Sequence, residues 1–216
     1  MIISPGRKFI FVHVPKTGGT ALSLALEARA MADDILVGDT PKARRRKRRA
    51  EAAQERASGR LWKHSSLADI EGLVDPTDYF VLTLVRNPWD RFVSYYHWLR
   101  EQTWDHPAVS IAKSKGFSDF LTDPVIEASL RQADYCSYVK TGTGNERCDL
   151  FARLERLDDD LAPFEAHLGF GLTPLPVVNA SERERDYRVY YDAALADHAA
   201  RIAAKDIARF GYSFSD

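Results

Sequence analysis

The stretch FIFVHVPKTGGTALSLALEARA, residues 9–30, decides the fold. Bulky aromatic and β-branched residues at 9–14 predict a buried strand, which Pro15 ends. Residues 16–20 form a glycine-containing turn, and strong helix formers follow at 21–30. Such a loop presents backbone N–H groups, and a helix N-terminus adds roughly half an elementary charge. The order strand, glycine loop, helix therefore predicts an anion site.

Each residue of the loop has a chemistry suited to phosphate. Gly18 and Gly19 permit close approach of the backbone, Lys16 supplies a full positive charge, and Thr17 and Thr20 can donate hydroxyls. An ATP-type loop requires Gly-x-x-x-x-Gly-Lys-Ser/Thr, with the lysine after the last glycine. Here the lysine precedes both glycines, which argues against that loop. An ordinary tight turn with a surface lysine is the alternative interpretation.

A second candidate anion site follows the clearest strand of the chain, residues 79–85. Arg86 lies at the C-terminal end of this strand, where ligands gather in open α/β sheets. Ser94 comes eight residues later, about two helical turns along. A guanidinium and a hydroxyl can jointly hold one phosphate. The alternative is that Arg86 pairs with a structural carboxylate such as Asp90, with Arg91 facing solvent.

Strands alternate with helices along the rest of the chain. Short strands are expected at 61–63 and 150–154, loops at 33–41 and 174–184, a helix starting at Pro88, helical pieces within 116–138, a helix at 158–167 ended by Gly169, and a long amphipathic helix at 187–210 ended by Gly211. This order predicts an α/β, P-loop-like three-layer fold with a mostly parallel central sheet flanked by helices. We expect residues 1–216 to form a single domain with a basic, mobile insertion at about 40–60.

Composition is that of an ordinary globular chain of 216 residues, with 45% hydrophobic residues, 28% charged residues and a net charge of −1. Residues 42–60 hold nine Lys or Arg against two Glu, so the charge is unevenly spread. There is no export signal or membrane-length apolar run, and we expect a cytoplasmic protein. Cys136 and Cys148 are then expected as reduced thiols, and no Cys or His cluster predicts a metal site.

Several motifs, in this order, resemble the nucleotide-dependent sulfotransferases, in particular the branch that contains carbohydrate sulfotransferases. The matching pieces are FVHVPKTGGT (11–20), LVRNPWDRFVSYY (84–96), FARLERLDDDL (151–161), VNAS (178–181), YRVYYD (187–192) and FGYSF (210–214). The resemblance implies 3′-phosphoadenosine-5′-phosphosulfate as donor. It implies that residues 16–20 bind the 5′-phosphosulfate and that Arg86 and Ser94 bind the 3′-phosphate. Lys16 and the loop amides can carry the developing charge, so no metal is expected.

His64 is the preferred catalytic base for the acceptor hydroxyl. An imidazole titrates near neutrality, and this one lies in a Lys-His-Ser-Ser loop comparable to the loop where the resembled family has its catalytic histidine. Lys63 either assists or is a surface lysine. His13 is expected in or beside the core and His97 on a surface or in packing contacts.

The resemblance favours a carbohydrate hydroxyl as acceptor. Seven of the eight residues at 42–49 are basic, so this run could hold an anionic glycan, or it could touch nucleic acid or an anionic membrane surface. The bland alternative is a solvated, mobile insertion. With a glycan as the acceptor, nucleic acid is not expected as a partner. The alternatives are a nucleotide kinase or NTPase that uses ATP and magnesium, and a non-catalytic module that binds nucleotides or polyanions.

Overall fold

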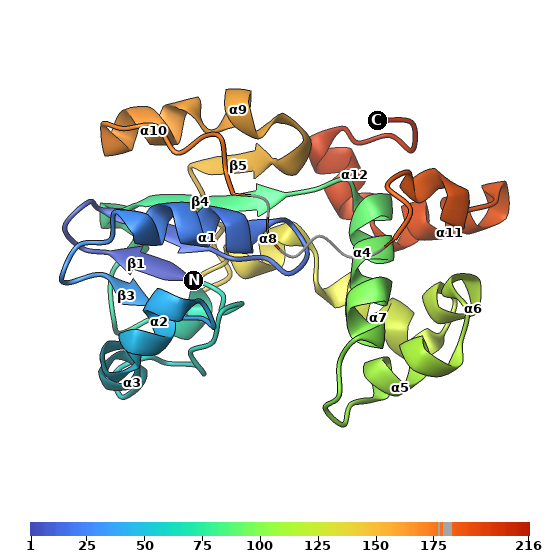
Figure 1. The fold of residues 1–216 in the computed structure, drawn as a ribbon, viewed down its shortest axis with the longest axis horizontal. Coiled ribbons are helices and arrows are strands. Elements are labelled where there is room, and N and C mark those ends of the chain that lie inside the picture. Colours follow the sequence, from blue (N-terminus) through green and yellow to red (C-terminus); the bar gives the residue numbers. More distant parts are fainter. Residues whose placement is uncertain (177, 179–182) are drawn as a thin grey trace. The chain divides into compact units, whose positions relative to one another are not determined.

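The computed structural model describes residues 1–176, 178 and 183–216. Their contacts divide the chain into two compact units (Figure 1). Unit 1 comprises Met1–Val85 and Tyr135–Asn179, and unit 2 comprises Arg86–Asp134 and Ala180–Asp216. This division is based on contacts and does not test whether residues 1–216 fold together, so the single domain stays a prediction.

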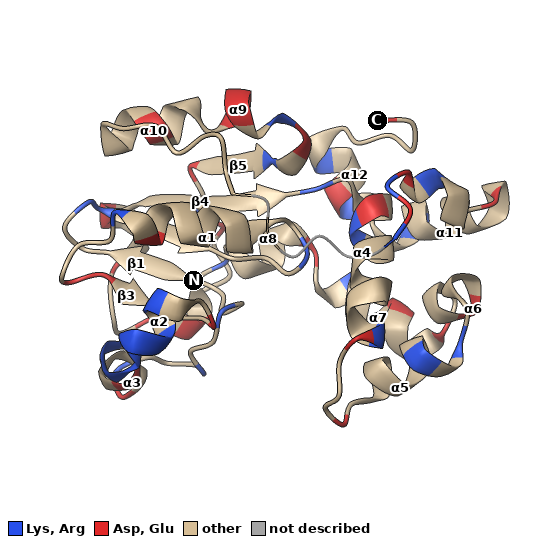
Figure 2. Ribbon diagram, viewed as in Figure 1, with Lys and Arg blue, Asp and Glu red and all other residues tan. Residues whose placement is uncertain are grey.

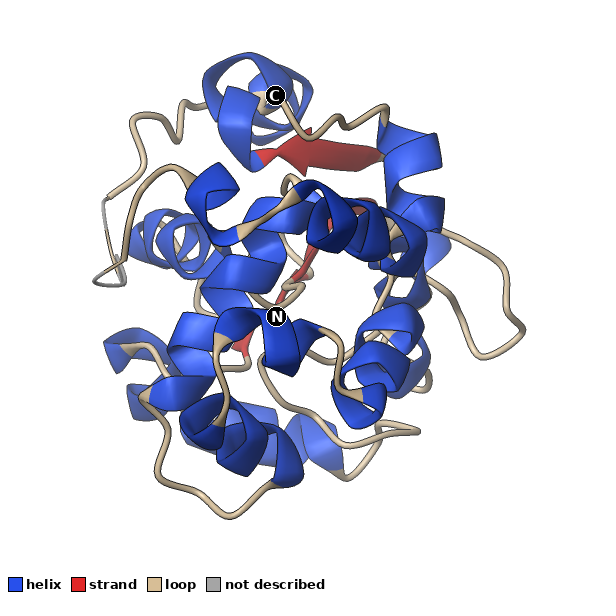
Figure 3. Ribbon diagram, turned by 90° about the vertical axis from the view of Figure 1, so that its right-hand side faces the viewer, coloured by secondary structure: helices blue, strands red, loops and turns tan. Residues whose placement is uncertain are grey.

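Unit 1 contains the sheet. Its elements are β1 (Ile2–Ser4), β2 (Phe9–Val12), α1 (Gly19–Ala28), β3 (Ile35–Leu36), α2 (Pro41–Arg45), α3 (Lys47–Gln54), the 3₁₀ helices η1 (Ala68–Ile70) and η2 (Pro76–Asp78), β4 (Phe80–Val85), α8 (Tyr135–Tyr138), β5 (Leu150–Arg153), η3 (Leu154–Arg156), α9 (Leu157–Asp160) and α10 (Ala162–Leu168). The strand order is β3-β1-β2-β4-β5. Helices make up most of the regular structure around these strands (Figure 3).

The sheet is mixed. β2 pairs with β4, and β4 with β5, in parallel, whereas β1 is antiparallel to both β2 and β3. The α/β fold with flanking helices is therefore confirmed, but the antiparallel β1 makes the sheet less parallel than expected. Neither β1 nor β3 was predicted, because strands of three and two residues are too short to show a period.

The side chains of β2 alternate between two hydrophobic cores, one on each face of the sheet. Phe9 and Phe11 pack in the cluster that holds the buried leucines of α1. Ile10 and Val12 belong to the opposite cluster, with Leu67 near η1 and others. Both faces of a parallel strand pair are thus covered, as its continuous hydrophobic run predicts. In register, Val12 of β2 lies beside Thr83 of β4, so the two strands end at the same edge of the sheet.

The basic insertion contains two helices. It forms α2 and α3, whose Ala43 and Ala53 are buried, and Figure 2 shows the concentration of Lys and Arg on these two helices. Thr40 begins α2: its hydroxyl oxygen accepts from the backbone N–H of Ala43 (3.2 Å). The same hydroxyl donates to the buried carboxylate of Glu27 on α1 (2.7 Å). The insertion is therefore anchored on α1.

Three cations of the basic run strengthen this anchor. They donate to backbone carbonyl oxygens at the end of α1 and in the loop that follows it: Lys42 to Glu27, Arg46 to Met31 (2.6 Å) and Arg49 to Ala32. Cations are favourable at a helix C-terminus, where carbonyl groups lack partners within the helix. Part of the basic run is thus structural.

Unit 2 is helical in the part that the structure describes. Its elements are α4 (Pro88–Arg100), α5 (Pro107–Ser114), α6 (Phe117–Leu121), α7 (Pro124–Gln132), η4 (Tyr187–Tyr190), α11 (Ala193–Ile202) and α12 (Ala204–Phe210). The helix expected at Pro88 is confirmed: the proline is in its first turn and the Asn87 side chain accepts from the N–H of Trp89 (3.1 Å).

Two predicted helices are interrupted. The helix expected at 187–210 is divided into η4, α11 and α12, because Asp192 starts a new helix by accepting from the N–H of Leu195 (2.8 Å). The helix expected at 158–167 is divided into α9 and α10 at Leu161, and Gly169 ends it in the left-handed conformation (φ 77°) as predicted.

The strand expected at 61–63 is wrong. The backbone N–H of Trp62 donates to the hydroxyl of Ser65 (2.8 Å), and the Trp62 side chain is 49% exposed, so this segment is a turn. The strand expected at 150–154 is confirmed as β5. Residues 177 and 179–182, which include part of the expected loop at 174–184 and most of the VNAS motif, lie outside the described residues. None of the helices in the described chain is long and apolar enough to cross a membrane.

Replacing Thr40 with alanine should destabilise unit 1 markedly. The substitution removes the N-cap of α2 and leaves the buried Glu27 carboxylate without its hydroxyl donor. We expect the free energy of unfolding to fall by about 2 kcal/mol in denaturant titrations. Thr122→Ala is the matched control, because that exposed hydroxyl only donates to the carbonyl of Ser118 (3.0 Å). Equal effects of the two substitutions would contradict the anchoring role of Thr40.

Candidate functional site

The glycine loop leaves β2 and starts α1, as the sequence predicts. Lys16 (φ 66°) and Gly18 (φ 81°) both adopt left-handed backbone conformations, so the chain turns sharply here. The Thr17 hydroxyl is buried and donates to the carbonyl of Val14 (2.8 Å), which holds the turn together. Gly18 caps α1 without a side chain, and the first turn of α1 carries no acidic residue. The N-terminus of α1 is therefore suited to an anion.

Both glycines are required by packing as well as by conformation. A Cβ atom at Gly18 would lie 2.6 Å from Cδ1 of Leu154. A Cβ atom at Gly19 would lie 2.2 Å from Cδ2 of the His13 ring. The loop is thus pressed against two side chains of its own unit.

His13 connects the glycine loop to His64. Its ring is 6% exposed and packs edge-on against the His64 ring, with centroids 4.7 Å apart. Its backbone carbonyl lies 2.7 Å from Nδ1 of His64. A carbonyl oxygen can only accept, so Nδ1 of His64 carries the proton, and Nε2 of the neutral ring is the acceptor nitrogen.

The surroundings of His64 keep its ring neutral. Burial is the main cause, opposed by the bond to His13 and supported by the charge of Lys63, and together they lower the pKa of His64 to about 4. The pKa of His13 is also lowered, chiefly by burial. Around pH 7, His64 is therefore unprotonated at Nε2.

Short polar contacts hold the loop around His64. Lys63 pairs with Asp39, with Nζ and Oδ2 2.7 Å apart, so its amine is engaged. The hydroxyl of Ser65 donates to the carbonyls of Arg60 and Trp62 (3.0 Å each). The Trp62 ring meets the His64 ring edge-on at 5.0 Å. Within unit 1, the structure thus brings together the glycine loop and His64.

The second predicted anion site lies in unit 2. Nε of Arg86 donates to Oδ2 of Asp90 (2.8 Å), so the pairing considered as an alternative is present. The other carboxylate oxygen, Oδ1, accepts from Arg183 at 2.6 Å. Ser94 lies one turn further along α4 and is buried. Two guanidinium groups therefore meet at one carboxylate here.

Two residues of this cluster differ from expectation. Arg91 does not face solvent: it is 6% exposed, and its guanidinium donates to the carbonyl of Ala133 (3.0 Å), because the side chain lies on the packed face of α4. Arg183 was not predicted at all. It lies between other charged residues in SERERDYR, and no spacing distinguishes it from them.

His97 follows Ser94 on α4 and is a packing residue, one of the two roles expected for it. Its ring lies edge-on to Tyr190 (5.3 Å), and its Nε2 is buried without a hydrogen-bond partner in the part of the chain that the structure describes. Burial and the charge of Arg183 lower the pKa of His97.

Among the residues that the structure describes, no group of three or more His, Cys, Asp or Glu could hold a metal ion. Cys136 and Cys148 are not joined in a disulfide in the described chain, and burial raises the pKa of Cys148 to about 12. A thiol with such a pKa is a poor nucleophile at neutral pH.

Comparison with known proteins identifies the family. A model of the sulfotransferase family matches residues 1–212, which include the glycine loop, His64, Arg86 and Ser94. The chain belongs to the sulfotransferase family. Neither the curated proteins nor the solved structures contain a significant match to it.

Family membership confirms two of the expectations. The chain is a member of the sulfotransferases that depend on 3′-phosphoadenosine-5′-phosphosulfate, and it is an enzyme of the sulfuryl-transfer class. The alternatives of a kinase or a non-catalytic module therefore receive no support from the comparisons.

The buried, neutral state of His64 in this sulfotransferase predicts a pH-dependent stability. Between pH 6.5 and about 4 the unfolded chain binds a proton that folded His64 does not. The free energy of unfolding should therefore fall as the pH is lowered through this window, by up to about 1.4 kcal/mol per pH unit for this one group.

Replacing His64 with asparagine should make this pH dependence shallower, since the amide keeps a donor for the His13 carbonyl but does not titrate. Denaturant unfolding of both proteins at pH 7, 6, 5 and 4 measures the effect. His13 titrates as well, so part of the dependence persists. Identical slopes in the two proteins would show that folding does not disfavour protonation of His64.

Proposed function

We propose that this enzyme transfers the sulfuryl group of 3′-phosphoadenosine-5′-phosphosulfate to an acceptor hydroxyl, with His64 as the base. The observation that carries the proposal is the bond from Nδ1–H of His64 to the His13 carbonyl (2.7 Å). This bond orients the ring so that Nε2 is the acceptor nitrogen. The carbonyl belongs to His13, whose ring packs against the glycine loop. In-line transfer requires a base and a phosphate cradle held in one compact unit.

His64 begins the reaction by accepting the proton of the acceptor hydroxyl at Nε2. The hydroxyl oxygen then forms a bond to sulfur while the bond between sulfur and the bridging phosphate oxygen breaks. The electron pair of that bond leaves with the phosphate. The products are a sulfate ester and the 3′,5′-bisphosphate, with the proton on His64.

Burial is the main reason that the pKa of His64 is lowered to about 4. A nearby negative charge favours the protonated imidazole and raises its pKa. The donor's phosphosulfate would supply that charge when it occupies the loop. Its arrival would therefore strengthen the base at the stage at which it is needed.

Lys16 and the amides at the start of α1 stabilise the leaving phosphate. The loop lysine contributes a full charge and the helix terminus a partial one. The absence of an acidic residue from the first turn of α1 leaves this charge undiminished there. Thr17, Gly18, Gly19 and Thr20 complete the cradle, with Thr17 acting mainly through the shape of the turn.

Arg86 and Ser94 bind the 3′-phosphate in this proposal, and the structure adds Arg183 as a third candidate. The guanidiniums of Arg86 and Arg183 converge on one carboxylate, that of Asp90. Groups that converge on a carboxylate can also converge on a phosphate. A dianionic phosphate would be attracted by these two positive groups.

The remaining parts of the proposal come from the sequence. We propose a carbohydrate hydroxyl as the acceptor, residues 1–216 as one sulfotransferase domain, no metal requirement and a cytoplasmic location. An acceptor panel of neutral and acidic saccharides, assayed with and without a chelator, tests the acceptor and the metal together.

Replacing His64 with alanine should reduce transfer by at least about 100-fold and leave the affinity for the 3′,5′-bisphosphate nearly unchanged. Transfer from radiolabelled donor and calorimetric binding of the nucleotide measure the two quantities. His167→Ala is the matched control, because that exposed histidine also meets a backbone carbonyl, that of Arg7 (2.8 Å). Persistent turnover in the His64 variant would place the base elsewhere.

Replacing Arg86 with alanine should weaken binding of adenosine 3′,5′-bisphosphate by roughly 10- to 100-fold, since a charge-assisted contact is lost. Binding of adenosine 5′-phosphate, which has no 3′-phosphate, should change little. Arg100→Ala, at the exposed end of the same helix, is the control. Equal losses for both nucleotides would exclude Arg86 from the 3′-phosphate site.

A further inference from the structure

A pocket lies between the basic insertion and the loop that carries His64. Its volume is about 580 Å³, which is in the range of small-molecule sites. The lining residues all belong to unit 1 and come from β3 and the segment after it, from α2 and α3, and from the turn before His64. They are Leu36, Val37, Gly38, Asp39, Ala43, Arg44, Lys47, Ala50, Glu51, Gln54, Leu61, Trp62 and Lys63. We call this the α2–α3 pocket.

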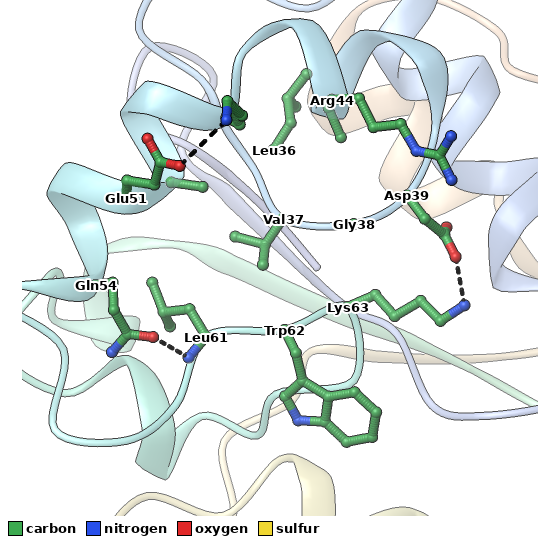
Figure 4. A pocket seen from close by; sticks show the side chains of 13 residues that line it. Leu36, Val37, Gly38, Asp39, Arg44, Glu51, Gln54, Leu61, Trp62 and Lys63 are labelled. Atoms are coloured by element: carbon green, nitrogen blue, oxygen red, sulfur yellow. Dashed lines mark hydrogen bonds and ion pairs between the residues drawn. The ribbon is translucent and has the colours of Figure 1, made fainter. Parts of the chain in front are cut away.

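The α2–α3 pocket has an apolar middle and charged sides. Figure 4 shows Arg44, Asp39 and Lys63 on one side and Glu51 on the other, with aliphatic side chains such as Val37 between them. Aliphatic walls give a sugar ring few hydrogen bonds but favour a hydrocarbon or aryl group. The middle of the pocket is therefore suited to an apolar part of a ligand.

The charged groups differ in how far they are already paired. Lys63 pairs with Asp39 at 2.7 Å, and Lys47 with Glu51 at 3.8 Å. Arg44 has no side-chain hydrogen bond or ion pair within the described residues, and it acts on Asp39 only through space. Its guanidinium is exposed at the side of the pocket. Arg44 is thus available to an anionic group of a bound molecule.

Two lining residues of the pocket belong to the loop that carries the proposed base. Trp62 lines it and meets the His64 ring at 5.0 Å. Lys63, the next lining residue, directly precedes His64 in the chain. A bound molecule that reaches past Trp62 and Lys63 would approach His64, where the proposed reaction removes the hydroxyl proton.

From these observations we propose that the α2–α3 pocket is an acceptor subsite for an anionic amphiphile. It takes an apolar group of the acceptor against its aliphatic walls, and Arg44 pairs with a carboxylate or sulfate of the same molecule. The proposal rests on the proposed function, because the bound molecule is the one whose hydroxyl faces His64. A short-chain lipid glycoside of an acidic sugar has this chemistry.

Four related glycosides test the two halves of the proposal separately. Octyl β-D-glucuronide has both the chain and the carboxylate, octyl β-D-glucoside only the chain, methyl β-D-glucuronide only the carboxylate, and methyl β-D-glucoside neither. Calorimetric titration below the micelle concentration should show the octyl glucuronide binding at least about tenfold more tightly than the methyl glucuronide. Equal affinities for those two ligands would overturn the apolar half of the proposal.

Two pairs of variants locate the binding. Arg44→Ala should weaken binding of octyl glucuronide by roughly three- to tenfold and leave binding of octyl glucoside unaffected. Arg45 is an exposed neighbour outside the pocket, so Arg45→Ala should change the binding of neither ligand. Ala50→Phe should fill the pocket and remove the preference for the octyl chain, whereas Ala52→Phe on the exposed side of α3 should preserve it. Indistinguishable behaviour of the members of either pair would overturn the assignment.

Turnover distinguishes failure of this proposal from failure of the proposed function. Binding of octyl glucuronide that depends on Arg44 and Ala50, without sulfation of any hydroxyl by the donor, would sink the proposed reaction while retaining the pocket as a ligand site. Sulfation of methyl and octyl glycosides with the same KM would overturn the subsite and leave the reaction intact. Thermal melting of each variant separates loss of binding from loss of folding.

Discussion

The arrangement of unit 1 depends on one residue, His13, at the point where β2 ends. Its carbonyl orients the His64 ring, and its own ring fills the space that the missing side chain of Gly19 leaves open. A single position thus fixes the glycine loop on one side and the proposed base on the other. Burial of both imidazoles keeps them neutral, so the two rings pack without mutual repulsion.

The sequence predicted those parts of the fold in which local and long-range preferences agree. The strand, glycine loop and helix at 9–30 were predictable because hydrophobic run, turn residues and helix formers follow each other without conflict. The start of α4 was predictable for the same reason, with Pro88 in its first turn. β1 and β3 were not predicted, because strands of three and two residues are too short to show a hydrophobic period. The turn at 61–63 was predicted as a strand, because the sequence does not show that the Ser65 hydroxyl accepts from the backbone N–H of Trp62.

The candidate site was predictable only where a motif existed. Residues 16–20, His64, Arg86 and Ser94 stood out by type and spacing, but the partners that orient them did not. His13 was expected merely in or beside the core, and Arg183 reaches Asp90 across 93 positions of sequence. The pairing of Arg86 with Asp90 was foreseen as an alternative. Contacts of this kind are set by tertiary folding, and no local sequence pattern predicts them.

The contacts of the basic insertion with the C-terminal end of α1 have a consequence for the glycine loop at the N-terminal end of this helix. Ten residues make a stiff rod about 15 Å long. Its positive end faces the glycine loop and its negative end faces Lys42, Arg46 and Arg49. The dipole of α1 therefore favours an anion at its N-terminus and the three cations at its C-terminus. α1 therefore connects the wall of the pocket, at α2 and α3, with the start of the glycine loop.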